Sequence, residues 1–192
     1  ETFKFWNKED ILSDVVWVIR NVQPDVIITR FSPKVNPERS THGHHTASAM
    51  LALEAFDIAA DPTMYPEQLE HVEPWQTKSI FWNTSYWFYG SVERMDKEVA
   101  KAPGDYIKID VNQYLPLVGK TGSDISSLSR SQHKSQGFGN SPVIGNQWEY
   151  LQILKGDIEE DLFTSSFKDK GLDAKIDKMI QKAIKGFNMH QP

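Results

Sequence analysis

The chain has 192 residues, of which 39% are hydrophobic and 24% are charged, a balance typical of a folded globular protein. Its formal net charge of -5 argues against a nucleic-acid partner, because phosphate binding requires a basic surface. The chain contains no cysteine, which excludes disulfides, cysteine zinc sites and thiol nucleophiles. No apolar run approaches the roughly 18 residues of a membrane-spanning helix. We therefore expect a soluble chain without a transmembrane segment, folded as a single domain over residues 1–192.

The first third of the chain predicts a helix, a strand and a second helix. Apolar residues repeat at helical spacing from Ile11 to Val22, with Asn7 as the predicted cap and Pro24 ending the helix. The β-branched run over residues 25–31 predicts a short strand that is buried on both faces, as in a parallel sheet. A second helix is predicted over residues 44–60.

The remainder of the chain continues the alternation of strands and helices. Strands are predicted over residues 78–86 and 106–111, the second at a sheet edge, and helices over 123–135 and 173–187. The last helix is expected to bury one apolar stripe, made of Ile176, Met179, Ile180, Ala183, Ile184 and Phe187. The pattern predicts an α/β fold, in which a further βα unit upstream of residue 1 would complete the sheet.

Histidines gather at one point of the sequence. Three of the six lie within four positions, as His42, His44 and His45 in the segment THGHHT. They follow a predicted buried strand and open a helix, where sites of open α/β sheets are usually found. Neutral imidazole is a good zinc ligand, and His42 and His45 are spaced to face one way. The alternative is a histidine-rich surface loop, because a catalytic zinc normally takes three protein ligands.

Two segments resemble signatures of a known family. Residues 24–28 read PDVII and are followed, after a loop, by HGHHTA over residues 42–47. This resembles the second signature of the LmbE-like (PIG-L) de-N-acetylases, a Pro-Asp strand, a loop and His-Pro-Asp-His opening a helix. The later segment SRSQHKSQ, residues 129–136, resembles a family helix that ends in His-x-Ser-Gln. The resemblance covers residues 7–140 and implies a Rossmann-like three-layer fold with a mainly parallel sheet.

The resemblance implies a zinc-dependent hydrolase that removes an N-acetyl group from an amino sugar or glycoconjugate. It makes His45 a zinc ligand, and it makes His42 the residue that stabilises the tetrahedral intermediate or donates a proton. It places His133 and Gln136 near the substrate. Arg30, at the strand end, is a candidate to hold a polar or anionic substrate group, with a surface cation as the alternative. His44 is a further candidate substrate contact, although its role is left open by the departure from the family pattern. The chain departs from the family in two ways. Gly43 and His44 replace Pro-Asp, and the first family signature, His-Pro-Asp-Asp-Glu, is absent from residues 1–192.

That missing signature supplies two zinc ligands and the general base in the family. The resemblance therefore implies a deacetylase domain truncated at its N-terminus, inactive alone and holding zinc weakly or not at all. An exposed sheet edge left by the missing unit would favour homo-oligomers. A periplasmic or secreted location suits glycan chemistry, but no residue specifies a compartment.

Two other functions compete with this prediction. Aromatic residues between Trp82 and Tyr89 are able to stack on sugar rings, which would make the chain a non-catalytic carbohydrate-binding module. Core packing is the commoner use of such residues. A third hypothesis is a structural or partner-binding domain whose histidines only titrate near pH 6.

Overall fold

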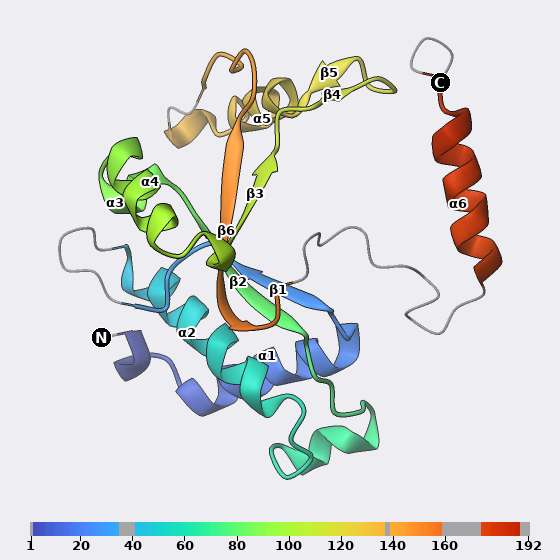
Figure 1. Cartoon of the computed structure of the whole chain (residues 1–192). Helices are drawn as coiled ribbons and strands as arrows, with labels where there is room; N and C mark the ends of the chain where they lie inside the picture. The colour runs from blue at the N-terminus through green and yellow to red at the C-terminus, as the bar shows by residue number, and fades with distance from the viewer. Residues whose placement is uncertain (1, 35–40, 137–138, 159–173, 189–192) are drawn as a thin grey trace. The chain divides into compact units, whose positions relative to one another are not determined.

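The computed structural model describes residues 2–34, 41–136, 139–158 and 174–188 (Figure 1). The chain divides into two compact units, Glu1–Lys108 with Glu149–Ile158 and Ile109–Trp148 with Glu159–Pro192. The described ranges hold six α-helices and six strands, so the predicted α/β class is confirmed. The single domain over residues 1–192 stays a prediction. None of the helices within the described ranges is long and apolar enough to cross a membrane.

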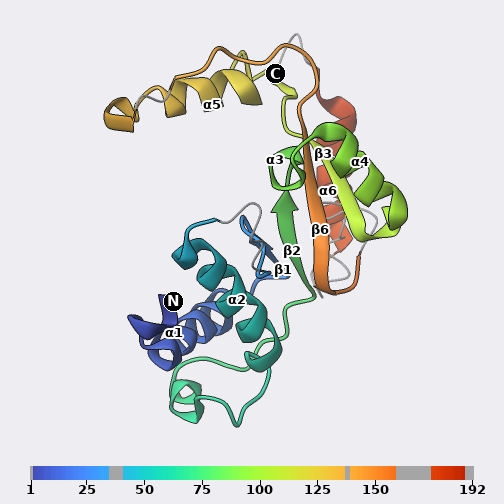
Figure 2. The same cartoon turned by 90° about the vertical axis from the view of Figure 1, so that its left-hand side faces the viewer.

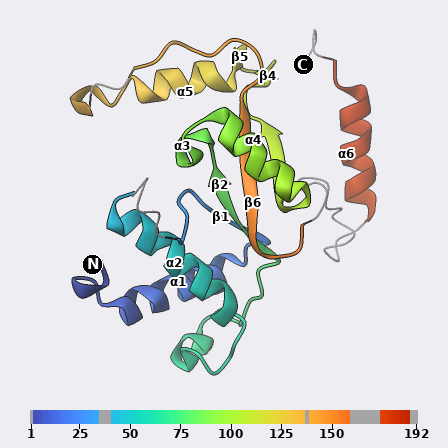
Figure 3. The ribbon, with the colours of Figure 1, turned by 60° about the vertical axis from the view of Figure 1, so that its left-hand side comes forward.

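The core of the first unit lies between two helices. Helix α1 covers Lys8–Val22 and α2 covers Gly43–Ile58, both close to their predicted ranges, and the two pack side by side next to β1 and β2 (Figure 3). Asn7 is the N-cap residue of α1 as predicted, and its side-chain amide donates to Asp10 Oδ2 at 2.5 Å. Six fully buried residues form the core cluster between the helices: Leu12, Val16, Ile19, Leu51, Ala55 and Ala59.

A mixed sheet of four strands carries the rest of the first unit. Its order is β1 (Val26–Thr29), β2 (Ser79–Thr84), β6 (Trp148–Gly156) and β3 (Tyr106–Asp110). Strand β2 runs parallel to β1, with Val26 opposite Ser79, whereas β6 runs antiparallel to β2. The sheet is therefore mixed, and the mainly parallel, Rossmann-like arrangement that the resemblance implies stays a prediction. Figure 2 shows α1 and α2 together on one side of β1 and β2.

Strand β1 corrects one prediction. The sequence predicted a strand buried on both faces, but Ile28 is 53% exposed and only Thr29 is fully buried. The reason is that α1 and α2 both lie on one side of β1, where Ile27 packs against their core, whereas the next side chain, Ile28, points to the opposite face. Strand β1 is also the terminal strand of the four and pairs with β2 alone among the described strands. Strand β3 lies at the other end of the order, which confirms its predicted place at an edge.

Several elements of the first unit were not predicted from the sequence. The aromatic run forms the short helix α3 (Tyr86–Tyr89), and α4 (Val92–Lys101) follows, capped by Ser91. The Ser91 hydroxyl accepts a hydrogen bond from the backbone amide of Arg94 at 3.2 Å, the usual N-cap contact. Single turns of 3-10 helix cover Thr2–Lys4, Pro66–Glu70 and Pro103–Asp105. The longest strand, β6, was also missed.

The second unit contains a small hairpin and two helices. Strands β4 (Tyr114–Leu115) and β5 (Lys120–Thr121) pair antiparallel and lead into α5 (Gly122–Arg130). A capping box of Thr121 and Asp124 fixes the start of α5, as expected for this residue pair. A 3-10 turn (Lys134–Gln136) follows.

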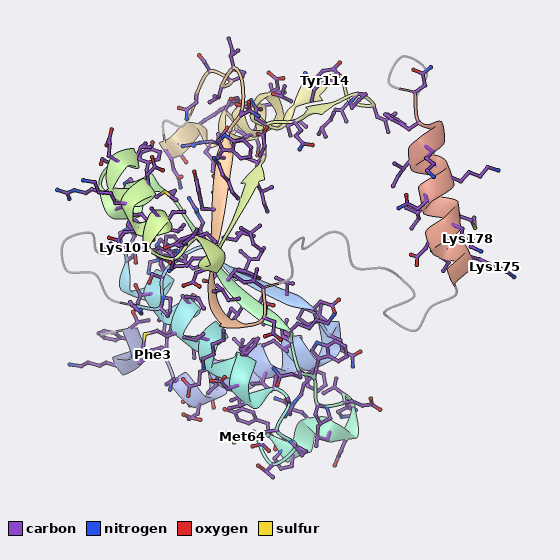
Figure 4. All side chains as sticks on the ribbon, in the orientation of Figure 1. Phe3, Met64, Lys101, Tyr114, Lys175 and Lys178 are labelled. Atoms are coloured by element: carbon purple, nitrogen blue, oxygen red, sulfur yellow. The ribbon has the colours of Figure 1, made fainter. Side chains whose placement is uncertain are left out.

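Helix α6 (Ala174–Gly186) confirms the last predicted helix but not its burial. The predicted stripe is exposed, with Met179 at 70% and Ile184 at 62%. Helical spacing shows which side chains share a face, but it does not show whether another element covers that face. Lys175 and Lys178 project from the same helix (Figure 4).

One buried cation joins the helices of the first unit to the segment after α2. Arg20, on α1, is 1% exposed, and its guanidinium donates to the carbonyls of Ala59 (3.0 Å), Asp61 (2.8 Å) and Met64 (2.9 Å). It also donates to the Tyr65 carbonyl and to Gln68 Oε1. Burial lowers the pKa of Arg20, whereas the charges of Asp61 and Glu67 raise it. The guanidinium nevertheless stays charged at neutral pH. Met64 marks this segment in Figure 4.

We expect Arg20→Met to lower the free energy of unfolding by about 3 to 5 kcal/mol, because it leaves several buried carbonyls without a donor. Urea unfolding followed by tryptophan fluorescence measures the change. Arg94→Met is the matched control, since Arg94 is exposed on α4. An Arg20→Met midpoint equal to that of the control would show that the network contributes nothing.

Candidate functional site

The histidine cluster, defined as His42, His44 and His45, lies where α2 begins. His42 is the N-cap residue of α2, and its carbonyl accepts a hydrogen bond from the His45 amide at 2.9 Å. The preceding strand β1 ends at Thr29, followed by Arg30 and Phe31. The cluster is therefore carried by the helix that follows β1 in the chain, as the sequence predicted.

The three imidazole rings lie close to one another. Their centroids are 5.5 Å apart for His42 and His44, 5.3 Å for His42 and His45, and 4.3 Å for His44 and His45. Phe31 stacks on His45, with ring centroids 4.0 Å apart and planes within 7°. His45 is half-buried, whereas His42 and His44 are exposed. Phe31 therefore fixes one histidine of the cluster in place.

The electrostatic environment of His45 favours its neutral form. Burial lowers the pKa of His45, and the nearby His44 and His42 lower it further, because their positive forms repel a third charge. A neutral imidazole has a lone pair free for a metal ion, so metal binding competes less with protons at this ring. The lowered pKa of His45 thus favours the form of the ring that is able to bind a metal ion.

The cluster alone does not form a complete zinc site. Within the described residues, no group of three His, Cys, Asp or Glu side chains is arranged to hold a metal ion. A catalytic zinc takes three protein ligands and one open position. The described residues therefore do not by themselves provide the three protein ligands of the zinc site that the resemblance implies.

A cavity of about 310 Å³ lies beside His45. Strand β1 and helix α2 line it with mostly apolar side chains, among them Ile27, Ile28 and Ala49. Arg30 and Phe31 line the same cavity. The structure thus brings two of the predicted site residues, Arg30 and His45, to one pocket at the end of β1.

Arg30 is held by two residues that the sequence did not single out. Its Nη1 donates to the Asn83 carbonyl at 3.0 Å and to Asn83 Oδ1 at 2.6 Å. Asn83 Nδ2 in turn donates to Glu149 Oε2 at 2.8 Å. Asn83 lies on β2 and Glu149 on β6, so this chain of contacts depends on the pairing of strands distant in sequence.

The aromatic residues of β2 and α3 between Trp82 and Tyr89 are partly half-buried and partly exposed. Trp82 meets the edge of Phe88, with centroids 5.1 Å apart, and its Nε1 is buried without a hydrogen-bond partner among the described residues. Tyr86 and Trp87 are 59% and 49% exposed. Burial and a hydrogen bond with Tyr89 raise the pKa of Tyr106 on β3. Trp82, Phe88 and Tyr89 are therefore half-buried, whereas Tyr86 and Trp87 are exposed.

The remaining predicted substrate residues belong to the second unit. His133 and Gln136 are exposed; His133 lies between the end of α5 at Arg130 and the 3-10 turn, and Gln136 is the last residue of that turn. They were predicted to lie near the substrate, and the histidine cluster belongs to the first unit. Their placement near a substrate stays a prediction.

Comparisons with known proteins do not identify the chain. No model of a known protein family matches the sequence, and no curated protein matches it either.

We expect the imidazole of His45 to titrate below its ordinary pKa of about 6.5, because burial and its neighbours oppose the charge. Proton NMR of the imidazole resonances measures this pKa. Phe31→Ala should raise it towards the ordinary value by exposing the ring to water. A His45 pKa above 6.5 in the unchanged chain would contradict this account of the site.

Proposed function

We propose that the chain is part of a zinc-dependent hydrolase that removes an N-acetyl group from an amino sugar or glycoconjugate. The supporting observation is His45, stacked on Phe31 with a lowered pKa, at the start of the helix that follows β1. The resemblance of this segment to the LmbE-like de-N-acetylases agrees with that chemistry. The proposal extends to a Rossmann-like three-layer arrangement of the complete domain.

Two histidines have distinct roles in the proposal. His45 binds the metal, and His42 donates a proton to, or stabilises, the developing tetrahedral intermediate. A zinc ion held by His45 and further ligands would supply the Lewis acidity that polarises an amide carbonyl and activates water. His42 lies at the N-terminus of the 16-residue helix α2, where the backbone amides favour a developing negative charge. His44 is exposed beside both rings and is able to contact the substrate.

The remaining ligands come, in this proposal, from a segment outside residues 1–192. The cavity between β1 and α2 lies next to His45, and β1 is terminal in the four-stranded order, pairing with β2 alone among the described strands. A segment that added a strand beside β1 would place residues at its carboxyl end close to His45. The 192-residue chain by itself would then bind zinc weakly and be inactive.

A carbohydrate-binding module is the second candidate, supported by the exposure of Tyr86 and Trp87. Exposed aromatic rings stack on the apolar faces of sugars. This function predicts sugar binding without metal that is abolished by Trp82→Ala or Trp87→Ala but unaffected by His45→Ala. The hydrolase proposal predicts that His45→Ala removes metal binding.

We expect calorimetric zinc titration to separate the two candidates. The 192-residue chain should bind zinc weakly, whereas the chain extended upstream by roughly a hundred residues of its natural sequence should bind one zinc tightly. His45→Ala should weaken binding by the extended chain about a hundredfold, because it removes a direct ligand.

His71→Ala is the matched control, since His71 lies in the segment after α2, away from the histidine cluster in sequence. Equal losses in both variants, or no tight binding by the extended chain, would reject the metalloenzyme and favour the binding module.

A further inference from the structure

The contacts of Arg30, Asn83 and Glu149 leave a specific set of hydrogen-bonding groups available. Nη1 of Arg30 is used by Asn83, while Nη2 and Nε of Arg30 donate to no group among the described residues. Glu149 Oε2 accepts from Asn83, and Oε1 accepts from no described donor. Arginine carries five N–H donors and a carboxylate only acceptors, so donors and an acceptor remain side by side.

The charges of this group nearly cancel. Arg30 Nη1 and Glu149 Oε2 are 3.9 Å apart, and their side chains are 53% and 30% exposed. A phosphate or carboxylate at Arg30 would lie near the Glu149 charge and be repelled by it. A hydroxyl group both donates and accepts, so it is able to use both partners without adding charge.

Asn83 makes the arrangement rigid. Its Oδ1 accepts from Arg30 and its Nδ2 donates to Glu149, so its amide orientation is fixed by two charged partners. The guanidinium of Arg30 also lies 5.9 Å from the ring centroid of Phe88, which provides an apolar neighbour. Arg30 lines the same cavity as His45. Paired polar groups beside an aromatic ring suit the hydroxyls and apolar face of a sugar.

From this geometry we infer that Arg30, Asn83 and Glu149 form a subsite that binds neighbouring hydroxyl groups of an uncharged sugar. Arg30 donates to one hydroxyl, and Glu149 accepts from the other. Its role as a subsite for the substrate rests on the proposed hydrolase function, and it restricts the substrate to amino sugars that carry no anionic group at this position. Sugar binding by these three residues does not itself require zinc.

The test is a metal-free NMR titration of the isotope-labelled 192-residue chain. N-acetylglucosamine should shift the side-chain amide signal of Asn83. Arg30→Met and Glu149→Gln should each weaken binding about tenfold, because each removes a hydrogen bond to a charged group. Lys155→Met is the matched control, since Lys155 pairs with Asp57 through exposed side chains. N-acetylglucosamine 6-phosphate should bind no more tightly than the uncharged sugar.

Several outcomes would overturn the inference. The first is an Asn83 side-chain amide signal that does not shift when N-acetylglucosamine is added. The second is equal affinity for the sugar in the Arg30→Met and Lys155→Met proteins, provided that both keep the NMR spectrum of the folded, unchanged chain. The third is clearly tighter binding of N-acetylglucosamine 6-phosphate than of the uncharged sugar. Sugar binding through Asn83 without acetate release by the extended, zinc-loaded protein would reject the hydrolase but keep the subsite. Acetate release with an unchanged KM in Arg30→Met would reject the subsite but keep the hydrolase.

Discussion

The buried guanidinium of Arg20 is the contact on which the arrangement of the first unit depends. Four backbone carbonyls and the Gln68 side chain accept its hydrogen bonds in place of water. Gln68 also binds α1 directly, because its Nε2 donates to the carbonyl and hydroxyl of Ser13. A charge this deeply buried is tolerated only when its donors are satisfied, so the segment after α2 has little freedom to move away from α1.

The Arg20 contacts also constrain the candidate site, because α2 connects the two. Ala59, which accepts from Arg20, lies at the C-terminal end of α2, while His42 caps the other end. The apolar core between α1 and α2 and the Arg20 contacts together fix the direction of α2. The histidine cluster therefore projects from a rigid element, although its own side chains are mostly exposed. Such a site places imidazole rings that are accessible to ligands on a rigid helix.

Local sequence patterns predicted those features that depend on local structure. Helical spacing predicted the bounds of α1, α2 and α6 to within a few residues. His42, His44 and His45 lie close together in space because they are near neighbours in the sequence. The patterns failed where burial depends on distant segments. Ile28 lies on a terminal strand and is exposed, and the apolar stripe of α6 is exposed as well. Glu149 was missed because β6 was missed, and only the pairing of β6 with β2 brings it to Asn83. The stacking of Phe31 on His45 likewise requires the tertiary fold.

The central claim is that the histidine cluster is one side of a zinc-dependent amide hydrolysis site. Acetate release from N-acetylglucosamine compounds by the zinc-loaded, upstream-extended chain tests it most directly. The claim predicts release that stops when zinc is chelated and falls at least about a hundredfold in His42→Ala, whose role is proton donation or charge stabilisation. No release, or release that survives both chelation and His42→Ala, would contradict it.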